Sequence, residues 1–454
     1  MKKIFFLSLT LSTIIFSCKK NDTVAPVPSN KVDTLSNSIT SDLTLNANTP
    51  YVINGQVYVK NNATLTIPAG TTVSVMPTLD RASKGVLVIT QGSKLIVNGT
   101  IDKPVVFTSA ATNKMPGDWG GIIINGKAPT NIGTGNSAGL PLSDDTKYGG
   151  TASDDNSGSL KYLRIEYCGG INPDNEDEWA VDKVSGLSLE SVGSGTMIDN
   201  VMVTHSNDDG FQFVGGTVNA THLIAYNNGD DDYDFDLGYE GKLQYLLSYR
   251  TGLQSNHALR ANGIESYNDA TPTSNKPYTR PVISNITIIG PQGMETSKTN
   301  LNQGIYIRKG TRFAIQNSIV AEYPQGGLMV CNRTRPILLA GVESQFKYNL
   351  LHSDSVNRTF SWDQDYRVIG DSILQKFALS DLNSNVQITN TDEFKFKAMY
   401  AANGPDLTLL DGSPALTGAN FDAVDFSSFF EKVTYRGAFG STNWAIANNW
   451  AVWK

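Results

Sequence analysis

Two acidic segments near the middle of the chain have the residue types of a cation-binding site. Residues 207–212 read NDDGFQ, and residues 229–236 read GDDDYDFD. Calcium prefers carboxylate, amide and carbonyl oxygens and takes six to eight of them. We therefore predict a calcium site whose ligands come from these two segments, namely Asp208, Asp209, Asp230, Asp231 and Asp232.

The same residues have two other interpretations. Adjacent aspartates often occupy turns, where their carboxylates accept hydrogen bonds from backbone N–H groups and bind no metal. Carboxylates near basic residues can also cleave polysaccharides, either by calcium-assisted elimination with a basic residue or by paired-carboxylate hydrolysis. The residues available for such catalysis are Asp208, Asp231, His257 and Arg260.

The two acidic segments are consecutive copies of a repeat. At an offset of 22 residues, which is 233 minus 211, Phe211 aligns with Tyr233 and the neighbouring aspartates also align. A unit of this length, with three short strands and three turns, is one coil of a parallel β-helix, in which each coil pairs with the next. The repeat therefore predicts that Phe211 and Tyr233 lie on adjacent parallel strands.

Strand alternation assigns directions to the side chains of both segments. If the aromatic side chains point into the core, every second residue between them points outward. Asp209 and Asp231 share the parity of the aromatics, so we expect them to lie in turns or to be neutralised. The residues expected on the outer, solvent side are Gly210, Gln212, Asp232, Asp234 and Asp236.

The rest of the chain has the pattern of an all-β fold. Short β-branched runs such as residues 64–67, 86–89 and 122–124 end at Gly, Asn or Asp, and no segment has sustained helical spacing. We predict one β-helix over residues 42–420, followed by an aromatic cap over residues 421–454 that covers an end or flank of the helix. Three polar segments interrupt the pattern and are expected to be loop insertions: 127–159, 171–183 and 267–281.

The first residues have the organisation of a secretory signal. Two lysines precede an apolar run over residues 4–16, which is too short to cross a bilayer as a helix, and Ser17 and Cys18 follow. We predict a signal peptide over residues 1–18 with lipidation of Cys18, and a flexible tether over residues 19–41. Several acyl chains on one cysteine would give stable membrane anchoring.

Charge and cysteine content narrow the function further. The chain has 36 basic and 43 acidic residues, a formal net charge of −7, and no basic stripe. This composition argues against nucleic acid as a partner. After lipidation of Cys18, only Cys168 and Cys331 remain for a disulfide, and the sequence does not decide whether they pair.

Several segments resemble a known family, the β-helical surface lipoproteins of Bacteroidetes and other Gram-negative bacteria. The matching motifs are TLTIPAGT at 64–71, WGGIIING at 119–126, VGSGT at 192–196, the two acidic segments, and the GAFG ending at 437–440. The resemblance implies a right-handed, pectate-lyase-like parallel β-helix at the outer membrane or cell surface. It implies no established activity.

These observations lead to two functional hypotheses. The first is a lipid-anchored, non-catalytic surface protein that binds a glycan, the matrix or an envelope partner, with calcium as a candidate ligand and Trp179 as a candidate binding residue. The second is a polysaccharide lyase or glycoside hydrolase on the same scaffold. The segment Ile307-Arg308-Lys309-Gly310 is similar to the basic strand of polygalacturonases, but the glycines that flank the histidine in that family are missing around His257.

Overall fold

The computed structural model describes ten segments of the chain: residues 32–78, 84–170, 184–251, 261–269, 274–291, 303–364, 367–401, 403–426, 428–445 and 450–453. Several residues singled out from the sequence lie outside these ranges. They are Cys18, Trp179, His257 and Arg260.

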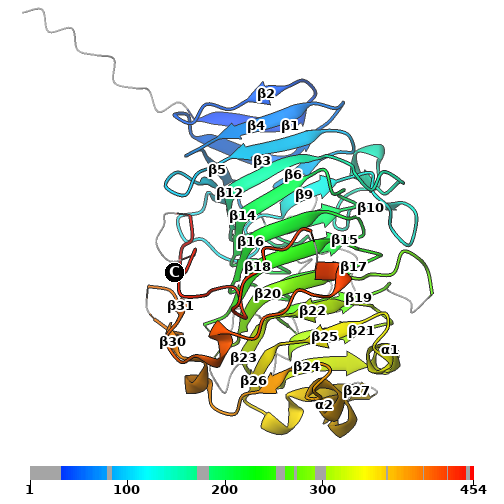
Figure 1. The fold of residues 1–454 in the computed structure, drawn as a ribbon. Helices are drawn as coiled ribbons and strands as arrows, with labels where there is room; N and C mark the ends of the chain where they lie inside the picture. The colour runs from blue at the N-terminus through cyan, green and yellow to red at the C-terminus, as the bar shows by residue number, and fades with distance from the viewer. Residues whose placement is uncertain are drawn as a thin grey trace, which may run out of the picture. The chain divides into compact units, whose positions relative to one another are not determined.

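The described residues form a parallel β-helix, as predicted (Figure 1). Twenty-seven of their strands join one sheet, and every strand pair in it is parallel except β27 with β28. The sheet winds through three faces in each coil. We number these faces in the order in which the chain of one coil crosses them.

The first face carries one strand from each coil. It begins with the C-terminal parts of β1 (Asp33–Ile39) and β3 (Tyr51–Val59). Its other strands are β6 (Val86–Ile89), β9 (Gly121–Asn125), β13 (Leu187–Glu190), β15 (Phe211–Val214), β17 (Tyr233–Asp236), β19 (Ile264–Tyr267), β21 (Gln303–Arg308), β24 (Gly326–Cys331), β27 (Phe360–Gln364) and the antiparallel β28 (Arg367–Gly370).

The second and third faces share five long strands that bend in the middle. These strands are β12 (Gly158–Glu166), β14 (Met197–Thr204), β16 (Asn219–Tyr226), β18 (Lys242–Tyr249) and β20 (Val282–Ile289). The second face adds β2 (Leu43–Thr44), β4 (Thr64–Pro68), β7 (Lys94–Asn98), β22 (Ala314–Gln316) and β25 (Gln345–Lys347). The third face adds the start of β3 together with β5 (Thr72–Val75), β8 (Val105–Ser109), β23 (Ile319–Tyr323), β26 (Leu350–Ser353) and β29 (Val386–Gln387).

The bend between the second and third faces has a repeated backbone conformation. One residue per coil adopts a positive φ there, which lets the chain turn sharply without a loop. Asn accommodates this conformation more readily than most residues, and three of the seven positions carry it. The positions are Tyr162, Asn200, His222, Tyr245, Asn285, Asn317 and Tyr348.

The core confirms the register predicted from the repeat. Phe211 pairs with Tyr233 on adjacent parallel strands, and their rings stack with centroids 5.3 Å apart. On the next inward positions, Phe213 stacks on Phe235 at 5.0 Å. All four side chains are fully buried among aliphatic residues of the other faces. Offset aromatic stacking of this kind adds about 0.5–1.5 kcal/mol per pair to the burial of the rings.

The two ends of the β-helix differ from the predicted boundaries. Strand β1 pairs with β3 and lies inside the predicted tether, so among the described residues the sheet begins at Asp33. At the other end, the last strand of the large sheet is β29, well before residue 420.

Short helices and the C-terminal segment cover the remaining apolar surface. Helices α1 (Arg335–Ala340) and α2 (Ser372–Ala378) place Leu338 and Leu374 in the main core. None of the helices in the described ranges has both the length and the apolar character needed to cross a membrane. The 3₁₀ helices are η2 (Asp144–Thr146), η4 (Val356–Arg358), η5 (Thr391–Phe394), η6 (Pro414–Leu416) and η7 (Val424–Phe426).

The C-terminal segment packs along the outer side of the third face (Figure 1). It contains the hairpin of β30 (Phe396–Ala398) and β31 (Asp406–Leu409) and the predicted aromatic tail. Trp450 is fully buried in one cluster with the outward side chains of the third face, Met202, Ile224 and Leu247. The tail therefore covers a flank, as one form of the cap prediction expected.

The predicted insertion at residues 127–159 is described throughout and lies between β9 and β12, but it ends at residue 157 because Gly158 and Ser159 begin β12. It includes a small antiparallel pair, β10 (Gly135–Asn136) and β11 (Lys147–Tyr148), and the helix η2. Of the other two predicted insertions, 171–183 lies outside the described residues, and 267–281 is described only in part.

Candidate functional site

Three of the five predicted metal ligands converge. Asp208, Asp209 and Asp230 each offer a carboxylate oxygen, and these oxygens all lie within 4.8 Å of one another. The three residues lie in the turns that enter β15 and β17, on neighbouring coils. We call Asp208, Asp209 and Asp230 the aspartate cluster. The repeat brings them together because equivalent turns of successive coils stack.

Asp231 does not join the aspartate cluster. Its Oδ1 accepts hydrogen bonds from the backbone N–H of Asn262 at 2.6 Å and from the Asn262 side-chain amide at 2.8 Å. On the coil before, Asp209 Oδ1 accepts a hydrogen bond from the Asp231 N–H at 3.0 Å. Equivalent side chains therefore each bind the backbone of the next turn, which is the ladder of turn hydrogen bonds considered as an alternative to a metal site.

Asp232 also lies outside the aspartate cluster, because its carboxylate binds other residues. Its carboxylate is fully buried and receives hydrogen bonds from Arg250 Nε at 3.1 Å, Ser248 Oγ at 2.6 Å and Asn228 Nδ2 at 3.1 Å. Arg250 is itself 1% exposed and donates further hydrogen bonds to the carbonyl oxygens of Asn228, Asp230 and Asn262. This arginine joins two consecutive turns and holds the backbone carbonyl of Asp230, one residue of the aspartate cluster.

The outward row of the first face is polar but largely buried, which corrects the expectation of solvent-exposed carboxylates. Gln212, Asp234, Glu265 and Tyr306 follow one another in register on β15, β17, β19 and β21. Asp234 is 4% exposed, and its Oδ1 is buried without a hydrogen bond. Parity gave the direction of these side chains correctly, but it does not report what packs over them.

A second outward row, two residues further along the strands, also carries polar and charged side chains. Tyr267 donates a hydrogen bond to Asp236 Oδ2 at 2.8 Å, and Asp236 Oδ1 is buried without a hydrogen bond. On the next strand, Arg308 Nη1 lies 3.0 Å from Glu265 Oε1. Lys309 lies over the ring of Tyr267, 5.1 Å from its centroid. Arg308 at the end of β21 and Lys309 just after it therefore lie beside the acidic residues of β17 and β19.

The crowding of carboxylates changes their protonation. Burial raises the pKa of Asp209 well above its usual range, and the charges of Asp208 and Asp230 raise it further. Burial raises the pKa of Asp234 as well, with Asp236 as the next contributor. Burial raises the pKa of Asp236 to about 7, although its hydrogen bond from Tyr267 acts in the opposite direction. Such groups favour a shared proton or a bound cation.

Glu190 lies on the first face, in β13, and was not among the residues predicted from the sequence. It is fully enclosed beneath the insertion, where Ser137 Oγ donates a hydrogen bond to its Oε2 at 2.6 Å. Burial raises the pKa of Glu190 to about 8, opposed by this hydrogen bond and aided by Asp236. Only its even spacing from Ser188 on an outward-facing row could have indicated it.

The candidate catalytic residues are not brought together in the described part of the chain. Asp208 lies in the aspartate cluster and Asp231 binds Asn262, while His257 and Arg260 lie outside the described ranges. Cys168 and Cys331 are both free thiols. Cys168 is buried in the core, and burial raises its pKa to about 12.

Comparison with known proteins identifies the family of the β-helix. A search of curated proteins finds no match. A family model described as a pectate-lyase-like β-helix domain matches residues 37–402, which span every strand from β2 to β29. This match, together with the three-faced parallel sheet, shows that the chain belongs to the pectate-lyase-like β-helix family.

Proposed function

We propose that this protein is a lipid-anchored cell-envelope protein that binds polysaccharide through a divalent cation held by the aspartate cluster. The observation that carries the proposal is the convergence of Asp208, Asp209 and Asp230, whose carboxylate oxygens lie within 4.8 Å of one another. Anchoring is supported by the residues before Asn21, which have a basic start, an apolar run and Cys18 in the order of a lipoprotein signal.

Electrostatics supports a cation at the aspartate cluster. Two carboxylates about 4.8 Å apart repel by roughly 3 kcal/mol at an effective dielectric constant of 20. A third carboxylate within the same distance adds to this cost. Calcium would convert the repulsion into coordination and would use carboxylate and carbonyl oxygens of these turns.

The shape of the first face supports a long ligand. Five polar residues of this region remain partly exposed, on successive coils that repeat about every 4.8 Å. They offer amide, carboxylate, hydroxyl and ammonium groups to a chain of hydroxyl-bearing units that runs along the face. They are Gln212, Asp230, Glu265, Tyr267 and Lys309. Calcium coordinated by three side chains keeps positions for sugar oxygens.

Calcium is expected to stabilise the mature protein. At a concentration about 100 times the dissociation constant, a ligand of the folded state contributes about 2.7 kcal/mol. For a protein of this size we expect the thermal midpoint to rise by about 2–5 °C between chelator and calcium. Differential scanning calorimetry at fixed ionic strength measures this shift directly.

Variants assign the calcium effect to the aspartate cluster. Asp230→Asn removes one charge while preserving side-chain shape, and it should abolish most of the calcium-dependent shift. Asp144→Asn is the matched control, because Asp144 is exposed and pairs with Lys147 at the surface. A midpoint that does not respond to chelator would contradict the proposed cation and would favour the turn ladder alone.

The binding role is separated from catalysis by a polysaccharide screen. Soluble protein without residues 1–18 is incubated with acidic and neutral polysaccharides, with calcium or with chelator. Retention on a polysaccharide column that requires calcium and is weakened by Asp230→Asn would support the proposal. Release of unsaturated or reducing ends by the wild-type protein would overturn the non-catalytic role, whereas absence of any retention would overturn polysaccharide as the ligand.

A further inference from the structure

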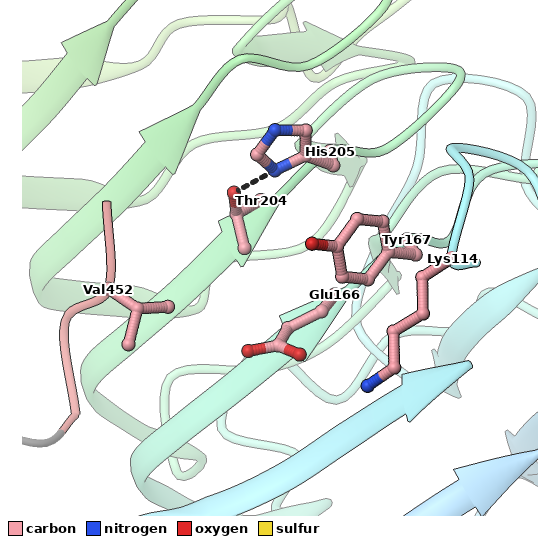
Figure 2. A pocket seen from close by; sticks show the side chains of 6 residues that line it. All are labelled: Lys114, Glu166, Tyr167, Thr204, His205 and Val452. Atoms are coloured by element: carbon pink, nitrogen blue, oxygen red, sulfur yellow. Dashed lines mark hydrogen bonds between the residues drawn. The ribbon is translucent and has the colours of Figure 1, made fainter. Parts of the chain in front are cut away.

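A cavity of about 220 Å³ lies at the end of the third face, at the edge of the C-terminal segment, and its residues Thr204 and His205 directly precede the turn that carries Asp208 and Asp209. Figure 2 shows six side chains around it: Val452 comes from the C-terminal segment, Lys114 from the segment between β8 and β9, and the others from the ends of β12 and β14 and the residues that follow them. The residues that line it are Lys114, Glu166, Tyr167, Thr204, His205 and Val452.

One wall of the cavity is formed by a buried carboxylate, one oxygen of which pairs with an arginine. Glu166 is 9% exposed, and its Oε1 lies 2.5 Å from Arg164 Nε. Within the described part of the chain, its Oε2 has no hydrogen bond. Arg164 compensates the charge of Glu166. Its Nη1 also donates a hydrogen bond to the carbonyl oxygen of Trp450 at 3.1 Å. The cavity therefore offers a fixed acceptor without a net negative charge.

Lys114 brings a positive charge to the same cavity. Its ammonium donates a hydrogen bond to Thr108 Oγ1 at 2.9 Å and lies 5.8 Å from the centre of the Tyr167 ring. It forms no salt bridge with any described residue. The ring of Tyr167 stacks on His205 at 5.3 Å, and Thr204 Oγ1 lies 2.7 Å from His205 Nδ1. The aromatic wall is thereby held in place by its own contacts.

We propose that this cavity binds a small carboxylate that also carries hydroxyl or amino donors, such as a sugar acid or an amino acid. The carboxylate of the ligand would pair with the Lys114 ammonium, and a donor group of the ligand would bind Glu166 Oε2. Val452 would contact the apolar edge of the ligand. The volume of the cavity accommodates one such molecule and excludes a folded partner.

The charges around the cavity favour this ligand class over a neutral sugar or a cation. Burial lowers the pKa of His205, so its ring is neutral at neutral pH and Lys114 is the cation among the lining residues. With Glu166 compensated by Arg164, the lining retains one positive charge. This site shares no residue with the aspartate cluster, so neither proposal depends on the other.

The test titrates the mature protein with three probes: sodium D-glucuronate, L-alanine and D-glucose. Binding is followed by saturation-transfer NMR and isothermal titration calorimetry. We expect millimolar binding of glucuronate or alanine and none of glucose, and the two carboxylates separate the sugar-acid source from the amino-acid source. Lys114→Met should weaken carboxylate binding by at least about tenfold, because it removes a charge-assisted hydrogen bond.

A matched lysine controls for the loss of surface charge. Lys161 lies on β12 and faces the ring of Tyr162 at 6.0 Å, outside the cavity. Lys161→Met should leave binding unchanged, and both variants should keep the wild-type thermal midpoint. Absence of carboxylate binding, equal binding of glucose, or unchanged affinity in the Lys114→Met protein would each overturn the proposed site.

Discussion

Replacing Arg250 by methionine is expected to lower the free energy of unfolding by about 3–5 kcal/mol, because it leaves a buried carboxylate without its partner. Arg250 and Asp232 are both almost fully enclosed and lie 3.1 Å apart. The variant also loses the hydrogen bonds to the carbonyl oxygens of Asn228, Asp230 and Asn262. Chemical denaturation, followed by tryptophan fluorescence, measures the change.

A double variant distinguishes the charge pair from simple loss of packing. Asp232→Asn combined with Arg250→Met removes both charges and should be less destabilised than the sum of the single variants. Arg335→Met serves as a comparison, since the Arg335–Asp371 pair is more accessible and its loss should cost less. A cost below about 1 kcal/mol for Arg250→Met would show that the buried pair does not stabilise the turns.

Arg250 also links stability to the proposed cation site. Because its guanidinium holds the carbonyl oxygen of Asp230, its loss should disorder the turn that presents the aspartate cluster. In the Arg250→Met protein, the calcium-dependent rise in thermal midpoint should therefore be smaller than in the wild-type protein. A full calcium shift in this variant would mean that the aspartate cluster does not depend on the arginine.

The fold could be predicted from the sequence because each coil of a β-helix corresponds to one repeat in the sequence. The 22-residue offset between Phe211 and Tyr233 corresponds to one pairing step in the sheet. The next step, from Tyr233 to Ile264, takes 31 residues, which is 264 minus 233. The additional residues of this step therefore hide the alignment of Glu265 with Asp234, although both lie on the same outward row.

The site was less predictable because its contacts join residues that are distant in sequence. Asp231 and Asp232 look equivalent to Asp230 in the sequence, but Asn262 and Arg250, both between β18 and β19, bind their carboxylates. Asp234 and Asp236 alternate as outward residues should, and burial then changes their chemistry. Parity gives the direction of a side chain, whereas its surroundings depend on loops that have no repeat.

Glu190 should make the protein less stable as the pH rises. Burial raises its pKa to about 8 in the folded state, above the usual glutamate value of about 4.5. The folded state therefore holds a proton that the unfolded state releases, and this contribution is fully present below about pH 4.5 and is lost as the pH rises towards 8. A shift of about 3.5 pKa units corresponds to at most about 4–5 kcal/mol.

Glu190→Gln isolates this contribution because glutamine keeps the shape and the acceptor for Ser137 but cannot ionise. The variant and the wild-type protein should have similar stability near pH 5, and the variant should be more stable by up to about 4 kcal/mol at pH 8. Glu343→Gln is the control, since this half-exposed residue pairs with Arg312 at the surface and should change stability little at either pH. A pH-independent loss in Glu190→Gln would instead mean that the folded protein holds Glu190 ionised, with its charge stabilised by a partner.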